Sequence, residues 1–306
     1  MANLKIALGD IELKKPIILA SGTAGHGEIS DFFDQKNVGA IALKAVSMKK
    51  RTGNMPPRIV ETPAGVLNAI GLANEGIDHF EKSIIPKLKK IRVPLIANVV
   101  GDTADEYAAV VKRLTRFREI AAFELNVSCP NVHGKNKLFF EDNEVLKKMI
   151  ASCKKATKKT IIVKLPPAVF GIEELAKTAA DSGADIISLT NTIPAMEIDI
   201  RTERPMLGNN QGGLSGAAIR PIALRLVYRA SKAVSIPIIG GGGVSNADDV
   251  VKFMLAGATA VSIGTASMIT PNLPDTICRD LDRIIDGKNM KNIADLTGRL
   301  TLNSQK

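Results

Sequence analysis

Polar side chains stand at the ends of short apolar segments along most of the chain, and these are the residues best placed to do chemistry. In chain order, the apolar segments end at or just before Ser21, Lys44, Asn98, Asn126, Lys164, Asn191, Gly242 and Gly264. A lone lysine or asparagine at such a position is more often a turn or surface residue. Amides and ammonium groups together, however, suit a heterocycle that alternates N–H and C=O groups. We therefore interpret the set as one ligand site.

Two glycine-containing segments could hold a phosphate. Residues 240–243 are four consecutive glycines, and Gly264-Thr265 follows the next apolar segment. Glycine lets backbone N–H groups approach a phosphate closely, although a pair of tight turns is the plain structural alternative. The first run is not a dinucleotide-binding GxGxxG motif, because Ser245 occupies the last glycine position.

Cys129 is the candidate catalytic thiol, since it lies just beyond an apolar segment and beside Asn126. An inert small side chain is the alternative for any single cysteine. Cys153 and Cys278 fall in segments with helical periodicity, and we interpret both as structural. Three widely spaced cysteines argue against a disulfide framework and against an iron–sulfur cluster within this chain.

The three histidines do not indicate a metal. His26, His79 and His133 lack metal-ligand spacing and do not stand at the ends of apolar segments. His79 is expected on a helix, and His133, in a long loop, is a candidate for contact with substrate. We predict no metal site.

The elements that must position these residues alternate regularly. Short β-branched segments predict eight buried strands, at residues 17–20, 40–44, 95–98, 122–126, 160–165, 186–190, 237–240 and 260–263. Helical periodicity marks the segments between them, at residues 76–90, 102–117, 142–156, 172–182, 219–234 and 246–256. Eight alternating units predict an α/β fold, a (β/α)8 TIM barrel formed by residues 1–306 as a single domain. An open doubly wound sheet is the alternative.

Three connections are too long to be simple turns: residues 47–75, 130–139 and 192–214. Each follows a predicted strand, so all three emerge on the carboxyl-terminal face, where barrel enzymes have their active sites. We expect these insertions to be lids or binding loops.

The composition excludes several functional classes. The formal charge is +10, but the basic residues are spread along the chain and aromatic residues make up only 4%. Nucleic-acid binding is therefore not expected, because no basic stripe is interleaved with aromatic side chains. Neither a signal peptide nor a membrane span is apparent in the sequence, so we expect a cytoplasmic protein without a membrane partner.

The motifs together resemble the class 1 dihydroorotate dehydrogenases over nearly the full length of the chain. Residues 126–131 (NVSCPN) resemble the catalytic-loop motif of that family, residues 68–72 (NAIGL) its substrate loop, and residues 189–192 (LTNT) its sixth-strand motif. Residues 204–208 (RPMLG) and 212–216 (GGLSG) are similar to the class 1B branch in particular.

The resemblance implies a set of roles for individual residues. FMN would be contacted by Ser21, Lys44, Ala45, Asn98, Asn126, Lys164 and Thr190, and its phosphate and ribityl chain by Gly216, Gly242, Gly243, Gly264 and Thr265. Substrate, dihydroorotate or the product orotate, would be held by Lys44, Asn68, Ala69, Ile70, Gly71, Leu72, Asn126, Asn191 and Thr192. Cys129 would be the base.

Class 1B also implies partners, namely a second copy of the chain and a separate subunit that carries FAD and a [2Fe–2S] cluster and passes electrons to NAD. Residues 132–138 (VHGKNKL) depart from the usual class 1B lid and lean toward class 1A, whose members reduce fumarate. A dihydropyrimidine dehydrogenase-like flavoprotein is a nearby alternative. A Schiff-base aldolase that uses Lys44 or Lys164 is a more distant one.

Overall fold

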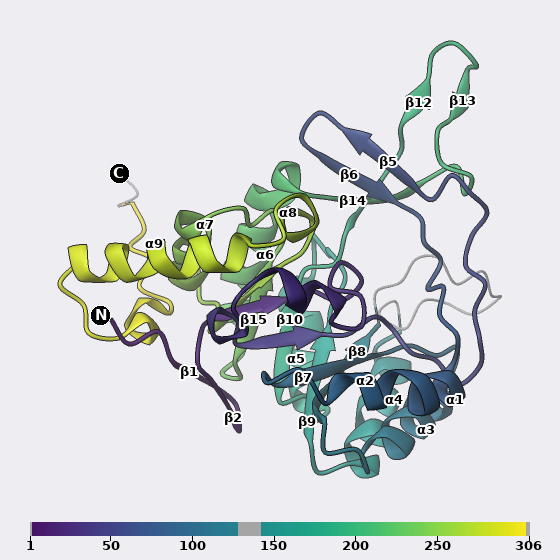
Figure 1. The fold of residues 1–306 in the computed structure, drawn as a ribbon, viewed down its shortest axis with the longest axis horizontal. Helices are drawn as coiled ribbons and strands as arrows, with labels where there is room; N and C mark the ends of the chain where they lie inside the picture. Colours follow the sequence, from purple (N-terminus) through teal and green to yellow (C-terminus); the bar gives the residue numbers. More distant parts are fainter. Residues whose placement is uncertain (1, 128–141, 304–306) are drawn as a thin grey trace.

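Eight parallel strands close into a barrel in the computed structural model, which describes residues 2–127 and 142–303 (Figure 1). In chain order they are β3 (Ile17–Leu19), β4 (Ala40–Ala42), β7 (Leu95–Val99), β8 (Ile120–Asn126), β9 (Thr160–Lys164), β10 (Ile186–Leu189), β15 (Ile238–Gly241) and β16 (Ala260–Ile263). Each strand pairs in parallel with the next, and β16 pairs with β3 to close the ring. The predicted TIM barrel is confirmed, and the open doubly wound sheet was wrong.

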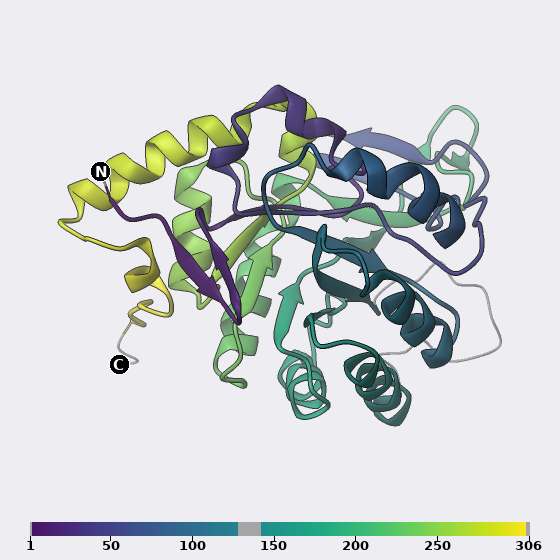
Figure 2. The same ribbon diagram turned by 60° about the horizontal axis from the view of Figure 1, so that its bottom comes forward.

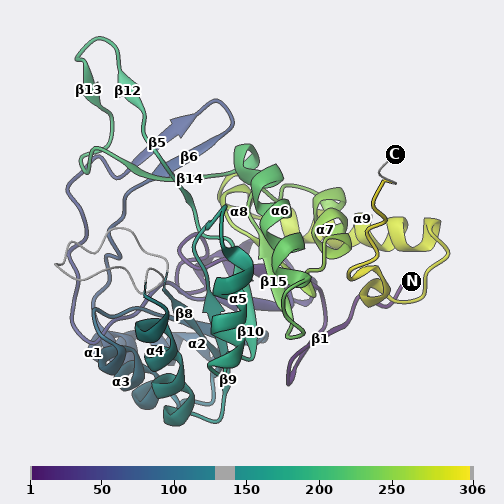
Figure 3. The same ribbon diagram turned by 180° about the vertical axis from the view of Figure 1, so that it is seen from behind.

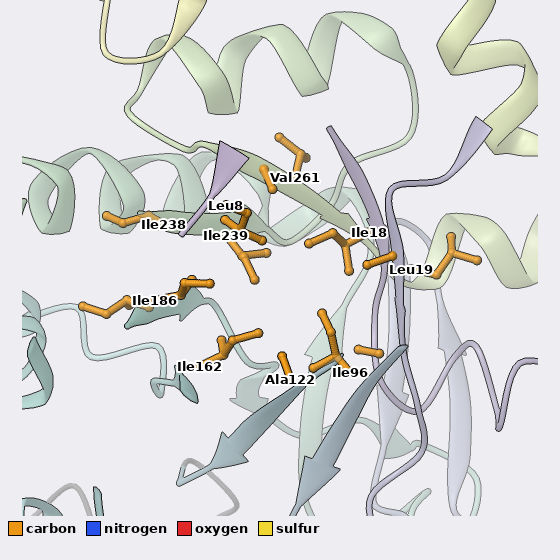
Figure 4. Close-up of a cluster of buried hydrophobic side chains, with 14 of the residues drawn as sticks. Leu8, Ile18, Leu19, Ile96, Ala122, Ile162, Ile186, Ile238, Ile239 and Val261 are labelled. Carbon is orange, nitrogen blue, oxygen red and sulfur yellow. The ribbon is translucent and has the colours of Figure 1, made fainter. Parts of the chain in front are cut away.

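The barrel strands are runs of Ile, Val, Leu and Ala because they are covered on both faces. Every residue of β7 and of β10 is buried. Side chains from strands around the ring meet in one apolar cluster, where Ile18 of β3, Ile96 of β7 and Ile239 of β15 gather (Figure 4). This packing determines where each strand ends, and therefore where the residues that follow the strand are placed.

Helices surround the barrel (Figure 2). The longer ones are α3 (Ala104–Leu114), α4 (Asn143–Ala156), α5 (Ile172–Asp181), α6 (Arg220–Ser231), α7 (Ala247–Leu255) and α9 (Leu273–Gly287). Shorter helical pieces are α1 (Ile77–His79), a π-helical turn η3 (Phe80–Ile84), α2 (Ile85–Leu88), α8 (Thr265–Ile269), and the 3-10 turns η1 (Glu28–Phe32), η2 (Gln35–Asn37), η5 (Ala217–Ile219) and η6 (Ile293–Leu296). Among the residues described, no helix has both the length and the apolar character needed to cross a membrane.

Local sequence sets the ends of the helices. Asp142 caps α4 by accepting hydrogen bonds from the backbone amides of Glu144 and Val145, and Asn246 caps α7 in the same way. Gly257 has φ +113°, a conformation that glycine reaches without strain, and it turns the chain from α7 toward β16.

A two-stranded hairpin precedes the barrel. Strands β1 (Ile6–Leu8) and β2 (Ile11–Leu13) pair antiparallel, and the side chain of Leu8 lies among those of the barrel strands (Figure 4). The turn of the hairpin, at Gly9, lies next to Ile186, the first residue of β10. The hairpin therefore covers the end of the barrel opposite the polar residues.

Two of the predicted long connections contain strands that the sequence did not predict. Within them β5 (Ile59–Thr62), β6 (Gly65–Asn68), β11 (Ile193–Ala195) and β14 (Gly212–Ser215) form an antiparallel sheet in the order β11-β14-β6-β5. Strands β12 (Ile198–Asp199) and β13 (Arg204–Pro205) form a hairpin that projects beyond that sheet (Figures 1 and 3). The third long connection, residues 130–139, lies outside the described residues.

Candidate active site

The carboxyl ends of the barrel strands meet at one mouth, and three predicted residues lie there on adjacent strands. Asn126 and Lys164, the last residues of β8 and β9, are opposite each other in the parallel register. Asn98, in β7, is opposite Glu124 in β8. Two amides and an ammonium group are therefore held by the barrel itself and not by a loop.

Glu124 joins these side chains and was missed by the sequence analysis. Its Oε1 accepts a hydrogen bond of 2.6 Å from Nδ2 of Asn98 and lies 3.9 Å from Nζ of Lys164. The carboxylate is buried, with only 5% of the residue exposed. A signal was present, because alternate residues of a strand point to the same side, so Glu124 must share a face with Asn126.

Asn191 extends the array toward the next strand. Its Nδ2 donates to Oδ1 of Asn126 at 3.2 Å, and its own Oδ1 accepts from the backbone N–H of Thr192 at 2.8 Å. The hydroxyl of Tyr107, on α3, donates to the carbonyl oxygen of Asn126 at 2.7 Å. The structure thus brings together three residues predicted for substrate or flavin contact, Asn126, Asn191 and Thr192.

The predicted substrate loop adjoins this group through the antiparallel sheet. Nδ2 of Asn68 donates to the carbonyl oxygen of Gly213 at 3.3 Å. Gly213 packs so closely against Thr192 that a β-carbon there would overlap the threonine hydroxyl. Ala69 is fully buried in a small apolar cluster with Val60. The sheet therefore places Asn68 near Thr192, whereas the side chain of Ala69 anchors the loop in the small apolar cluster.

The rest of the substrate loop folds against the preceding segment. The carbonyl oxygen of Ile70 accepts a hydrogen bond from the backbone N–H of Asn54 at 3.2 Å. Gly71 has φ +70°, and a β-carbon there would lie 2.6 Å from the backbone nitrogen of Asn54. Leu72 also has a positive φ, 58°. This conformation depends on glycine at position 71.

Two further predicted residues follow the first two barrel strands. The hydroxyl of Ser21 donates to the carbonyl oxygen of Leu43 at 2.7 Å, which ties the end of β3 to that of β4. The backbone N–H of Lys44 donates to the carbonyl oxygen of Gly25 at 2.7 Å. These two bonds fix the backbone on which the Lys44 ammonium is mounted.

Lys44 and Ala45 also line a cavity of about 600 Å³. Arg51 and Arg58 line the same cavity from the insertion after β4. Arg51 is paired with Asp102 at 2.8 Å, whereas the guanidinium of Arg58 donates to the backbone carbonyl oxygens of residues 52 and 54. Hydrogen bonds to carbonyl oxygens leave the charge of Arg58 in place, and the cavity is lined by four cationic side chains and by two glutamates, Glu28 and Glu75.

The predicted phosphate cradle is a close approach of glycine loops. Gly216, Gly242 and Gly243 have φ values of +96°, +123° and +79°. A β-carbon on Gly243 would lie 2.8 Å from the carbonyl oxygen of Gly216, so these two loops meet only because Gly243 has no side chain. Thr265 opens α8, and its hydroxyl donates to that of Ser215 at 2.8 Å. The loops after β14, β15 and β16 therefore converge.

A β-carbon would be accommodated at Gly264, the residue before Thr265. The nearest atom to a β-carbon built there would be that of Ala20, 3.7 Å away. Gly264 is thus the one predicted cradle glycine that is not closely packed. Backbone amides at such a loop and at the start of a helix are suited to a phosphate.

A buried ionic network lies directly beneath the cradle. The carboxylate of Asp249, on α7, has no exposed surface and accepts hydrogen bonds from Ser245, Arg220 and Lys252 at 3.0–3.1 Å. Burial alone would raise the pKa of Asp249, but hydrogen bonds from Lys252 and Ser245 and the charge of Arg220 lower it below its usual value. Arg220 also reaches the carbonyl oxygen of Gly243 at 3.5 Å.

Two buried oxygen atoms at the mouth test whether a flavin would fit. Oδ1 of Asn98 and Oγ1 of Thr190 are enclosed and have no hydrogen-bond partner among the described residues. A buried polar atom left unpaired costs about 1–3 kcal/mol. Thr190 lies beside Gly242, whose β-carbon would be 3.4 Å from the threonine methyl group. Polar groups of a bound FMN could form hydrogen bonds with both of these oxygen atoms, so the residues fit this cofactor.

The candidate base, Cys129, lies outside the described residues. Burial raises the pKa of Cys153 to about 12, and burial together with nearby acidic residues does the same for Cys278. Neither thiol would ionise near neutral pH, and both are enclosed, as predicted for structural cysteines. The two described cysteines are therefore excluded as bases.

Histidines do not assemble a metal site in the part of the chain that the structure describes, where no group of three or more potential ligands occurs. His79 lies on a helix, α1, as predicted, and is exposed there. His26 stacks edge-on against Phe80, and burial is the main cause that lowers its pKa. His133 lies outside the described residues.

A family model described as dihydroorotate dehydrogenase matches residues 3–285 of the chain. Among curated proteins, the chain is 44% identical over 299 residues to "Dihydroorotate dehydrogenase B (NAD(+)), catalytic subunit" of Pelobacter propionicus, covering 97% of this chain and 98% of that protein. Proteins with the same name from Carboxydothermus hydrogenoformans and Bacteroides thetaiotaomicron are 44% and 42% identical, each aligned over at least 97% of both chains.

A solved structure gives the same architecture. The crystal structure of DHODH in complex with ferulenol from Eimeria tenella superposes with a TM-score of 0.81 and covers 97% of this chain and 88% of that one. At 21% sequence identity, this likeness supports the barrel fold alone.

Proposed function

The chain belongs to the dihydroorotate dehydrogenase family, and we propose that it oxidises dihydroorotate to orotate with FMN as its cofactor. The observation that carries the proposal is the polar array across β7, β8, β9 and the segment after β10. There Asn98, Glu124 and Lys164 adjoin the hydrogen-bonded pair Asn126–Asn191. A planar heterocycle with N–H and C=O edges is what such an array would bind.

Bound FMN would accept the hydride that leaves C6 of dihydroorotate. The protein must then supply placement, charge and a base. We assign the removal of the C5 proton to the thiolate of Cys129, because the other two thiols are buried and hard to ionise. Glycines 216, 242, 243 and 264, with Thr265, would hold the phosphate on backbone amides.

Lys164 would provide positive charge at the pyrimidine edge of the flavin. Its ammonium group is mounted on the last residue of β9 and its side chain is only 14% exposed, so its field is not fully screened by water. A fixed cation there stabilises negative charge that develops during reduction. Lys44, at the end of β4 and beside a cavity with two arginines, would orient the carboxylate of the substrate.

The names of the curated relatives bear on the electron acceptor. They are called NAD(+)-type catalytic subunits, which supports a class 1B assignment and a separate subunit that passes electrons to NAD. We propose that this partner carries FAD and a [2Fe–2S] cluster, and that two copies of the present chain form a homodimeric core. We further propose that the enzyme works in the reducing cytoplasm, where thiols such as Cys153 and Cys278 remain free.

Purified protein assayed with a dye as electron acceptor tests the reaction. The chain should convert dihydroorotate to orotate, and should act far more slowly on dihydrouracil, which lacks the carboxylate. Equal rates on the two substrates would favour a dihydropyrimidine dehydrogenase-like activity. A colourless protein that borohydride traps on a carbonyl substrate would favour the aldolase.

A further inference from the structure

We propose that Glu124 is a positioning residue that fixes the orientation of the Asn98 amide and sets the reduction potential of the flavin by offsetting the charge of Lys164. The inference rests on the proposed function, since it assumes that FMN occupies the mouth of the barrel. It assigns a role to a carboxylate that the motifs of the chain did not single out.

Glu124 is held between two site residues by the barrel. It stands in β8, with Asn98 opposite it on β7 and β9 on its other side, where Lys164 is the terminal residue. Its Oε1 accepts from Nδ2 of Asn98 at 2.6 Å and lies 3.9 Å from Nζ of Lys164. Strand pairing on both sides fixes the backbone of Glu124 between β7 and β9, so its nearness to these two residues follows from the fold.

The first consequence concerns the orientation of an amide. An ionised carboxylate can only accept hydrogen bonds, so Asn98 must turn its NH2 group toward Glu124 and its Oδ1 away from it. That Oδ1 is the buried atom without a partner. Glu124 therefore obliges Asn98 to present an acceptor, which suits an N–H donor on the ligand. A glutamine at position 124 could offer its own NH2 group and allow the amide to flip.

The second consequence concerns charge. A buried carboxylate needs a compensating cation, and Lys164 is the one that the structure places near Glu124. The same ammonium group is expected to stabilise the electron-rich reduced flavin. Part of its field is then cancelled by Glu124, which keeps the flavin potential lower than Lys164 alone would set it. A lower potential favours release of electrons to the next carrier.

The test is a spectroelectrochemical titration of bound flavin in the wild type, Glu124→Gln and Asp185→Asn. Asp185 is a matched control, because its carboxylate also pairs with a lysine, Lys154, and accepts a backbone N–H, but does so just before β10, at the opposite end of the barrel. We expect a more positive midpoint potential in Glu124→Gln and no change in Asp185→Asn. In Glu124→Gln/Lys164→Gln, the potential should return toward the wild-type value.

A Glu124→Gln protein whose flavin potential and flavin dissociation constant both match those of the wild type would overturn the inference. If Glu124→Gln does not fold, Glu124→Asp keeps the charge but withdraws it from Asn98 by one methylene. Flavin retention weakened roughly tenfold at a near-constant potential would then support the role, and unchanged retention would overturn it. A wild-type chain that takes up no flavin would overturn the proposed function as well, so the two failures are distinguishable.

Discussion

Nη1 of Arg220 lies 3.0 Å from Oδ2 of Asp249, a carboxylate with no exposed surface. The pair joins the first residue of α6 to the first turn of α7, and the loop that carries Gly243 and Ser245 runs between them. One buried carboxylate therefore helps to hold both cradle loops, at Gly216 and at Gly243, in position. We expect that carboxylate to matter for cofactor retention although it touches no ligand.

Asp249→Asn should weaken FMN binding by roughly ten- to a hundredfold, because a hydrogen bond to a charged group is worth about 1.5–3 kcal/mol. The measurement is a fluorescence titration of flavin-free protein with FMN. Glu173→Gln is the control, since Glu173 pairs with Arg229 between α5 and α6, away from the glycine loops. Equal FMN affinity in the two variants would remove Asp249 from the cradle.

The same carboxylate predicts a pH dependence of stability. The folded-state pKa of Asp249 is lowered, so its contribution is present above the ordinary aspartate pKa of about 3.9 and is lost as the pH falls through the folded value. The free energy of unfolding of the wild type should therefore fall more steeply below about pH 4 than that of Asp249→Asn. Denaturant titrations across that pH range measure this free energy. If the network contributed nothing, it would change with pH equally in the wild type and in Asp249→Asn.

The eight barrel strands could be predicted because their signal is local. Runs such as residues 160–164 (TIIVK) are apolar, short and bounded by helix-forming segments. The strands of the insertions carry no such signal. Strand β14 begins with Gly212-Gly213, and it forms because it pairs with β11 on one side and with β6, far away in the sequence, on the other. Tertiary pairing overrides local propensity in such segments.

The candidate site residues that end apolar segments could be predicted from the sequence. A residue inside such a segment was missed. Glu124 interrupts β8 two residues before its end, where a charged residue in an apolar strand needs an explanation. Asp249 looked like an ordinary first-turn acid of a helix, and only the packing of α6 against α7 reveals its burial. The partners of these carboxylates include Ser245 and Lys252, which are close in sequence to Asp249, but Asn98, Lys164 and Arg220 are distant.

Cys129→Ala should retain flavin but slow its reduction by dihydroorotate by at least about a hundredfold, the usual contribution of a general base. Stopped-flow absorbance under anaerobic conditions measures this rate. Cys153→Ala is the matched control, because that thiol is buried on α4 and should not affect the rate. Normal reduction in Cys129→Ala would remove the cysteine from its assigned role.

The isolated chain should be reduced by dihydroorotate yet turn over NAD poorly, because the glycine run at residues 240–243 forms a phosphate cradle and not a dinucleotide motif. Co-expression with an FAD/[2Fe–2S] subunit should restore NAD reduction. Rapid NAD turnover by the chain alone would contradict the proposed partner, and rapid fumarate turnover would indicate a class 1A enzyme.

The most direct measurement is the absorption spectrum of the freshly purified chain before and after anaerobic addition of dihydroorotate. We expect a flavin spectrum with about one FMN per chain, as one cradle and one array imply, and bleaching of that spectrum as orotate appears. A protein that neither carries flavin nor takes it up, or whose bound flavin stays oxidised with dihydroorotate, would contradict it.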